Sequence, residues 1–486
     1  MRSSMKRSTL FIALLCMSLG SASAANAGPR FVVAHWLVPM DYQAGQSGIE
    51  RAKDDVRAAL EEGLDGFAFD AFSGKQAKNV IAAYIAAADS IGAATFKVAL
   101  SADMSTGFTA SDIVDTMVTY GDNPHYLKIE GKPLLSTYGG GKNGNMWWQM
   151  NVIDVLKKSG HPVTFVPYFD RPDPNAEEPN VDNWRKTIQS FPVVDGLFNF
   201  VIAGSPPFYT GDPNLGHHWW SSLEGEENLS KALSEQNKVF IAPYLPYYWA
   251  VCHPARQYLE YQAGRGMDNT WRSIITRQEP AAVEIVTWND FTESTFIQPT
   301  RIPTTRVKGI TPYPHLGYFE LLKYYVSWFH TGKPPTISKD ALFYFYRPSL
   351  RSATPSSETD AFCSIGRVRT SQLWGNLQNV MYVTTALTAP AILRVTTGGT
   401  TNSYEVPVGM NTTDVPLIAG KPTIELWRNG TKLIGSLGID VSETGAGDNF
   451  NVYGAYAVVG ESDSNTWKPS DAWKTGRISE WFNPSN

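Results

Sequence analysis

Acidic side chains follow several short apolar runs of this 486-residue sequence. Asp70 and Asp103 each stand at the end of such a run. Asp290 comes after the run 283–287, and Glu293 lies three residues further on. When two carboxyl groups share a site, their repulsion raises the pKa of one, which keeps its proton while the other is charged. A protonated acid beside an ionised carboxylate is the chemistry that cleaves glycosidic bonds.

Aromatic residues stand beside polar ones at several places, among them His35-Trp36, Trp147-Trp148 and Tyr247-Tyr248-Trp249. Aromatic faces stack on the C–H faces of sugars and polar edges bond hydroxyl groups, although ordinary core packing uses the same residue types. No set of His or Cys residues has the spacing of metal ligands, because the adjacent His217-His218 would point apart. We therefore expect neither a metal nor a cofactor.

The elements that must position the acids alternate between strand-like and helix-like segments. Helical periodicity with a stop at Gly63 predicts a helix around 49–62, and an alanine-rich segment predicts another over 76–91. Parallel strands need crossover connections of helix length, so this alternation predicts a (β/α)8 barrel over residues 28–337. The eight predicted strands are 31–34, 66–69, 96–100, 133–137, 163–167, 196–200, 239–243 and 283–287.

The main alternative is an open, doubly wound sheet. Such a sheet usually has a glycine-rich phosphate turn after its first strand, and residues 35–39 read His-Trp-Leu-Val-Pro instead. The barrel is therefore favoured, and its strand ends would bring the acids to one rim. Asp170 also ends a predicted strand, but Arg171-Pro172 follow it, and we interpret it as a turn or helix-capping residue.

The pattern of the sequence changes after residue 338. Short alternating runs such as 391–395 and 424–427 replace helical periodicity, and Asn429-Gly430 is a strong signal for a hairpin turn. This pattern predicts an antiparallel β-sandwich over residues 338–486. Two roles stay open for it, namely support of the barrel and binding of carbohydrate.

Residues 1–27 have the pattern of a secretory signal peptide. A basic start, an apolar run over 10–19 and Ala-Asn-Ala at 25–27 follow one another. The apolar run is shorter than the roughly 20 residues that cross a bilayer as a helix, which disfavours the alternative of a membrane anchor. We expect a secreted protein that is cleaved near Ala27 and does not stay in a membrane.

The charge balance argues against nucleic acid as a partner. The net charge is −5, and removal of residues 1–27, which carry three basic and no acidic residues, makes it more negative. Such a surface repels a phosphate backbone. Cys252 and Cys363 would remain, and whether they pair or stay separate thiols is left open. We expect a monomer.

The segment 283–294 reads Val-Glu-Ile-Val-Thr-Trp-Asn-Asp-Phe-Thr-Glu-Ser. It resembles the Trp-Asn-Asp-Tyr-Gly-Glu-Ser signature of glycoside hydrolase family 71, the α-1,3-glucanases often called mutanases. Weaker similarities occur in the family's order along residues 30–350, with a fainter continuation into the tail. They are Ala34-His35, Asp65-Gly66-Phe67-Ala68, Ser101-Ala102-Asp103-Met104, Pro133 through Tyr138, Asp195-Gly196-Leu197-Phe198 and Tyr346-Arg347-Pro348.

The resemblance implies an inverting hydrolase that acts within α-1,3-glucan chains, with Asp290, Glu293 and Asp103 as essential carboxylates. We expect Glu293 to be the acid. The base stays open between Asp290 and Asp103, because an inverting pair needs about 6.5–9.5 Å between carboxyl groups and a spacing of three residues does not fix that distance. The expected partner is thus a polysaccharide. The expected substrate-binding residues are His35, Trp36, Asp70, Tyr138, Tyr244, Tyr247, Trp249, Trp288 and Asn289.

The sequence departs from the family pattern around the expected substrate. Gly139 stands where the family has Glu, Asp70 where it has Asn, and Phe291-Thr292 where it has Tyr-Gly. Residues 245–249 likewise replace the family's Ser-Pro-Trp-Phe. Two alternatives therefore stay open, namely hydrolysis of a different microbial polysaccharide by the same acids and carbohydrate binding without turnover. The presence of all three acids argues against the second, because a binding protein has no need of an acid with a raised pKa.

Overall fold

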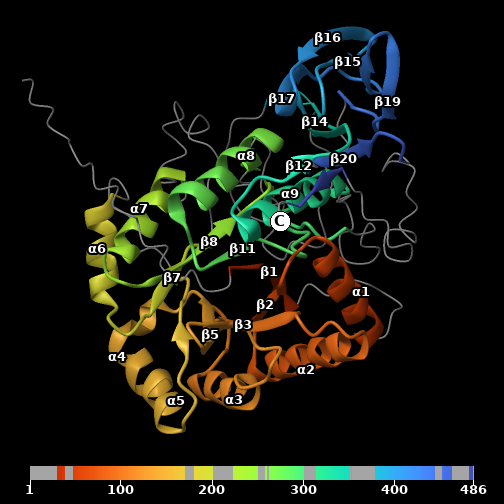
Figure 1. The fold of residues 1–486 in the computed structure, drawn as a ribbon. Coiled ribbons are helices and arrows are strands. Elements are labelled where there is room, and N and C mark those ends of the chain that lie inside the picture. The colour runs from red at the N-terminus through yellow and green to blue at the C-terminus, as the bar shows by residue number, and fades with distance from the viewer. Residues whose placement is uncertain are drawn as a thin grey trace, which may run out of the picture.

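The computed structural model describes residues 30–38, 48–169, 180–200, 223–249, 258–259, 262–299, 313–350, 352, 378–443, 451–461 and 481–484. Within these ranges, a curled sheet covered by helices is followed by two antiparallel sheets (Figure 1). No helix in them is long and apolar enough to span a bilayer. The expected signal peptide 1–27, Asp170, His217-His218, Cys252 and Cys363 lie outside the described residues.

Eight parallel strands form the main sheet, one for each predicted run, so all eight predicted strands are confirmed. A short strand that the sequence pattern does not predict, β4 (Lys128–Ile129), pairs antiparallel with one of them, β5. In sheet order the eight are β6 (Thr164–Phe165), β5 (Lys132–Tyr138), β3 (Lys97–Asp103), β2 (Gly66–Ala71), β1 (Phe31–Leu37), β11 (Ala282–Ile285), β8 (Val239–Tyr244) and β7 (Gly196–Phe198).

The sheet curls until its two end strands approach each other. The amide of Asp195 donates to the carbonyl of Phe165 over 2.9 Å, and the amide of Phe198 donates to the carbonyl of Pro167 over 3.1 Å. These bonds join the segment around β7 to the segment around β6.

Helices connect the strands and cover the outer face of the sheet (Figure 1). The first two lie where the sequence predicts helices, and Gly63, with a φ of 83°, follows the first in the left-handed conformation that commonly ends a helix. Among the described residues the helices are α1 (Gly48–Glu61), α2 (Gly74–Ser90), α3 (Ala110–Tyr120), α4 (Gly144–Trp148), α5 (Asp154–Lys158), α6 (Val181–Ser190), α7 (Leu223–Ser234), α8 (Gly264–Ser273) and α9 (Leu316–Thr331).

Alternation along the strands separates two apolar environments. Val33 and Ala68 belong to a cluster on the inner side of the curled sheet. Their neighbours Val32 and Phe67 belong to the larger cluster between the sheet and the helices. Successive side chains of a strand point to opposite faces, so this register decides which polar residues reach the interior.

The tail contains two four-stranded antiparallel sheets. Leu342 and Leu393, one from each sheet, belong to a single hydrophobic cluster. The predicted hairpin is confirmed, because Asn429 and Gly430 have φ values of 50° and 78° and connect two paired strands. The first sheet is β17 (Gly409–Pro416), β14 (Val380–Leu387), β13 (Ala341–Tyr346) and β20 (Tyr453–Val458); the second is β16 (Thr400–Val406), β15 (Ala391–Thr397), β18 (Thr423–Arg428) and β19 (Thr431–Leu437).

The first tail sheet packs against α9 of the helix layer. The rings of Tyr318 on α9 and Phe345 on β13 lie 4.4 Å apart, and both residues belong to the main hydrophobic cluster. Trp481 is fully buried and donates from Nε1 to Glu320 over 3.2 Å. Directly after it, β21 (Phe482–Asn483) pairs with β12 (Thr336–Ile337), so the end of the chain returns to the beginning of the tail.

Candidate active site

Polar side chains gather at one edge of the curled sheet's interior. His35 of β1, Asp70 of β2 and Asp103 of β3 lie toward the C-terminal ends of adjacent parallel strands. They continue the two-residue alternation of Val33 and Ala68, so they point to the inner side. Because parallel strands end at a common edge, their side chains meet there.

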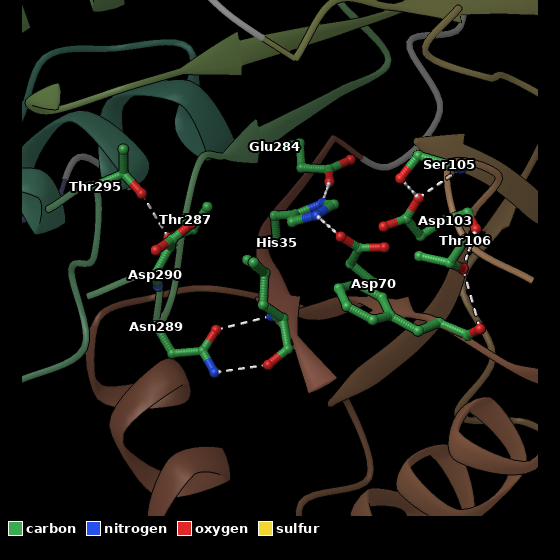
Figure 2. A network of polar contacts seen from close by, with 12 residues as sticks. His35, Asp70, Asp103, Ser105, Thr106, Glu284, Thr287, Asn289, Asp290 and Thr295 are labelled. Atoms are coloured by element: carbon green, nitrogen blue, oxygen red, sulfur yellow. Dashed lines mark hydrogen bonds and ion pairs between the residues drawn. The ribbon is translucent and has the colours of Figure 1, made fainter. Parts of the chain in front are cut away.

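The imidazole of His35 lies between two carboxyl groups (Figure 2). Its Nδ1 is 2.6 Å from Oε1 of Glu284 on β11, and its Nε2 is 3.3 Å from Oδ2 of Asp70. Burial alone would lower the pKa of this histidine, but the bonds to Asp70 and Glu284 outweigh it and raise the pKa to about 10. His35 is therefore a buried imidazolium at neutral pH.

Asp70 and Asp103 lie side by side on this inner surface. Burial raises the pKa of Asp70, and the nearby charges of Glu284 and Asp290 add to the rise, whereas His35 opposes it. Burial and the charge of Asp70 raise the pKa of Asp103. Oδ1 of Asp103 accepts bonds from the amide of Ser105 over 2.7 Å and from its hydroxyl over 2.6 Å. Ser105 thus fixes the orientation of Asp103.

Asp290 sits in a tight turn that its own side chain organises. Its Oδ1 accepts bonds from the amide and hydroxyl of Thr292, over 2.8 and 2.7 Å, and from the amide of Glu293 over 2.9 Å. The Asp290 amide donates to the hydroxyl of Thr287 over 2.9 Å, and that hydroxyl lies 2.8 Å from the hydroxyl of Thr295. Burial raises the pKa of Asp290, although the bonds from Thr292 and Glu293 favour its charged form.

Glu293 is the second acid of this turn, and its pKa is also raised. Burial and the charge of Asp290 raise its pKa to about 8, against the opposing effect of a hydrogen bond with Tyr248. Its side chain is still partly exposed, and its carbonyl accepts a bond from the amide of Trp249 over 2.8 Å. At neutral pH this carboxyl group is protonated and ready to donate.

Two tyrosines lie near the carboxyl groups. Burial raises the pKa of Tyr138, at the end of β5, and the charges of Glu293, Asp70 and Asp103 add to the rise. Burial also raises the pKa of Tyr248, and the charges of Glu293 and Asp290 contribute. Between them the two hydroxyl groups therefore lie within electrostatic reach of Asp70, Asp103, Asp290 and Glu293. Tyr248 belongs to β9 (Tyr248–Trp249), which pairs with β10 (Tyr258–Leu259).

Five aromatic residues expected to contact substrate lie instead in the core. Trp36 and Tyr244 occupy the strand positions that face the helices, where they contact Phe69, Tyr84 and Trp271. Tyr247 contacts His315, Trp249 is completely buried, and Trp288 packs on Phe67. At 0–2% exposure the rings of Trp36, Tyr244, Tyr247, Trp249 and Trp288 offer no face to a sugar, so we correct the expectation and assign them to packing.

Asn289, which the sequence places among the expected substrate contacts, is hydrogen-bonded to the backbone at the end of β1. Its Oδ1 accepts from the amide of Leu37 over 2.8 Å, and its Nδ2 donates to the carbonyl of Leu37 over 3.0 Å (Figure 2). The side chain is fully buried. It ties the turn that carries Asp290 to the end of β1.

Two residues of the site are absent from the sequence-based set. Glu284 stands at an inward position of β11, opposite Val33 in the register of the sheet. A charged residue inside an otherwise apolar strand was the signal for it. Tyr248 carries no such signal, because its neighbours Tyr247 and Trp249 have the same character and only the backbone conformation distinguishes them.

In the described part of the chain, no three His, Cys, Asp or Glu side chains are grouped so that they could hold a metal ion. What the arrangement offers is proton transfer. The carboxyl group of Glu293, whose raised pKa favours its protonated form, lies within electrostatic reach of Asp290, and the buried imidazolium of His35 favours the charged form of Asp290.

Comparison with known proteins gives matches along most of the chain. The profile of glycosyl hydrolase family 71 matches residues 28–466. Glucan endo-1,3-alpha-glucosidase agn1 of Schizosaccharomyces pombe is 26% identical over 456 residues, which cover 91% of this chain and 98% of that protein. A mutanase of Penicillium rubens is 26% identical over 470 residues, which cover 93% and 95%.

Among solved structures, the GH99 endo-alpha-mannosidase of Bacteroides thetaiotaomicron gives a TM-score of 0.47 at 14% identity. The match covers 62% of this chain and 97% of that one.

Proposed function

Because the chain belongs to glycosyl hydrolase family 71, we propose that it hydrolyses α-1,3-glucosidic bonds within glucan chains. The observation that carries the proposal is the pair formed by Glu293, whose pKa is raised to about 8, and the neighbouring Asp290. The names of the relatives from Schizosaccharomyces pombe and Penicillium rubens support the choice of linkage. Their alignments run over nearly the whole length of both chains.

In the proposed reaction Glu293 gives its proton to the glycosidic oxygen as the C–O bond breaks. Asp290 takes a proton from a water molecule, and the resulting hydroxide attacks the anomeric carbon from the opposite face. We assign the base to Asp290, because its charge adds to the effect of burial in holding the proton on Glu293. Asp103, whose Oδ1 is engaged by Ser105, remains the competing base.

Azide separates the two candidate bases. In an inverting enzyme that has lost its base, azide replaces the activated water and yields a β-glycosyl azide from an α-linked substrate. We expect azide to restore turnover in Asp290→Ala and not in Asp103→Ala. The reverse pattern would transfer the role of the base to Asp103.

The substrate is tested with insoluble α-1,3-glucan. We expect reducing ends to appear, internal cleavage to give a range of oligosaccharides, and NMR to detect the β-anomer first. The Glu293→Gln variant is the control for contaminating activity. An initial α-anomer would refute inversion. Activity only on another polysaccharide in a panel would show that the same acids hydrolyse a different microbial polysaccharide. Binding without any new reducing ends would support a non-catalytic carbohydrate-binding protein.

The proposal includes a division of the chain. Residues 28–337 would form a (β/α)8 barrel whose closure is supported by the bonds from Asp195 to Phe165 and from Phe198 to Pro167. Residues 338–486 would form a β-sandwich, supported by the hydrophobic cluster that its two sheets share.

Export completes the proposal, since an insoluble glucan lies outside the cell. Residues 1–27 would be removed as a signal peptide. N-terminal sequencing of protein from the medium should then begin directly after Ala27, and size-exclusion chromatography should give a monomer. An intact Met1 on the recovered protein would refute cleavage.

A further inference from the structure

The second tail sheet carries a cavity far from the acids. The cavity has a volume of about 510 Å³, which falls within the range of about 300–1,000 Å³ typical of small-molecule sites. Most of its lining residues belong to β15, β16 and β18. Figure 1 shows β15 and β16 at the end of the molecule away from β1, β2 and β3. The cavity is lined by Pro390, Ala391, Ile392, Glu405, Val406, Pro407, Trp427, Arg428 and Asn429.

The indole of Trp427 is held in place by charged neighbours that do not line this cavity. Its Nε1 donates to Oε2 of Glu425 over 2.9 Å. The guanidinium of Arg394 lies 4.6 Å from the ring centre, and the ammonium of Lys432 lies 5.9 Å from it. Neither cation lines the cavity, whereas Trp427 does. The part of its ring that faces the cavity is therefore open to a ligand. A ring fixed in advance loses little entropy on binding.

Polar groups of both charge signs stand around the aromatic wall. Arg428 is anchored by two bonds to Asp340, of 2.6 and 2.9 Å, which keep its guanidinium in place. Glu405 and Asn429 are exposed and add a carboxylate and an amide to the lining. This mixture gives no net attraction for an anion or a cation. It suits a neutral ligand with many hydroxyl groups and apolar C–H faces, which is the chemistry of a glucan segment.

We propose that this cavity binds a segment of glucan chain and holds the enzyme on insoluble substrate. The inference rests on the proposed function for the identity of the glycan. In this arrangement the tail sheet supplies attachment and the curled sheet supplies the chemistry. Attachment matters only when the substrate is a solid, because a soluble oligosaccharide reaches the acids by diffusion.

The test compares Trp427→Ala with Leu437→Ala, an exposed residue of the same sheet that does not line the cavity. Binding to insoluble α-1,3-glucan is measured by co-sedimentation in the inactive Glu293→Gln background. We expect Trp427→Ala to weaken binding about fivefold, as the loss of one stacked aromatic contact would. Activity of the otherwise wild-type enzyme should fall on the insoluble glucan and stay unchanged on soluble α-1,3-linked oligosaccharides. The Leu437→Ala variant should match the parent in both assays.

Glu405→Ala is the second variant, in case Trp427→Ala does not fold. Equal binding of Trp427→Ala, Glu405→Ala and the parent would overturn the proposal, as would equal losses on soluble and insoluble substrate. A change from monomer to dimer that depends on Trp427 would also overturn it, in favour of a second copy as the occupant. Hydrolysis of soluble oligosaccharides reports on the proposed function independently, so the two failures can be told apart.

Discussion

The carboxyl groups of Asp70 and Glu284 hold His35 between them, at 3.3 and 2.6 Å, with no exposed surface on the ring. Their bonds outweigh the desolvation of the imidazolium and place a fixed positive charge inside the curled sheet. This charge favours the ionised form of Asp290. In the proposed mechanism His35 would be a positioning residue, which acts on the reaction through the carboxylates around it. Asp70, which stands where the family has Asn, supplies one of its two partners.

Glu284→Gln should lower the pKa of His35 and weaken the fall of stability in alkali. The folded-state pKa of about 10 lies above the ordinary histidine value of 6.5, so the stabilisation by this proton is complete below about pH 6.5 and disappears as the pH rises toward 10. With one partner removed, the stabilisation should be smaller and should be exhausted at a lower pH, so the variant and wild-type curves should converge in alkali. At neutral pH we expect the free energy of unfolding to fall by about 2 kcal/mol, as for other bonds to a charged group.

Thermal denaturation between pH 6 and 10 measures this effect, with Glu224→Gln on the exposed start of α7 as the matched control. The control should follow the wild-type curve at every pH. Parallel curves for Glu284→Gln and wild type, merely offset by a constant, would show that Glu284 does not set the protonation of His35.

Glu293→Gln should reduce kcat by roughly 10²–10⁴-fold, which is the usual contribution of a general acid. The loss should not come from misfolding. The pKa of Glu293 is raised from 4.5 to about 8, so folding stability is lost as the pH rises from about 4.5 to about 8, and glutamine escapes that penalty. The melting temperature of the variant should therefore equal that of wild type below about pH 4.5 and exceed it by a growing margin up to about pH 8. A lower melting temperature at all pH values would remove the basis for reading the kinetic loss as a loss of acid catalysis.

Tyr248→Phe should move the alkaline limb of the pH–kcat profile to higher pH. The hydrogen bond with Tyr248 lowers the pKa of Glu293, so its removal lets that pKa rise further and keeps the acid protonated in stronger alkali. A shift of roughly 0.5–1 in pH is expected for one hydrogen bond. The control is Tyr244→Phe, a buried tyrosine on the helix side of the sheet, which should leave the limb in place. A limb that moves to lower pH would mean that another group titrates there.

Much of the fold follows from patterns that local chemistry imposes on the sequence. Parallel strands buried on both faces require apolar runs, and their crossovers require helices, so the strands around Phe67 and Ile241 can be found without coordinates. The Asn429-Gly430 hairpin is equally local, because positive φ values favour those residue types. By contrast, β4 has only two residues and exists because of its pairing with β5, which no local pattern reveals.

The site was only partly predictable from the sequence. The alternation of side chains along the strands explains why. The acids lie at strand ends, where position alone indicates a shared edge. For the aromatic residues, the question is which face of the sheet each side chain points to. The two-residue alternation that starts from the inward Val33 turns Trp36 toward the helices. Proximity in sequence to His35 suggested the opposite. For Tyr247 and Tyr248, which leave the regular strand, only tertiary packing determines which ring faces the acids.

Asn289→Ala should reduce kcat more than it changes KM, because the side chain holds the catalytic turn and does not reach the substrate. Both of its bonds go to the backbone of Leu37, and both backbone groups would lose their partner, at a cost of about 2–3 kcal/mol in unfolding free energy. Asn289→Asp keeps the acceptor for the Leu37 amide but sets a carboxylate oxygen against the Leu37 carbonyl, so it should rescue little. Asn402→Ala in the tail sheet is the control and should alter neither stability nor turnover. Steady-state kinetics on soluble oligosaccharides, read together with denaturant unfolding, give the answer. A variant with wild-type kcat and a raised KM would return Asn289 to the substrate-binding group in which the sequence first placed it.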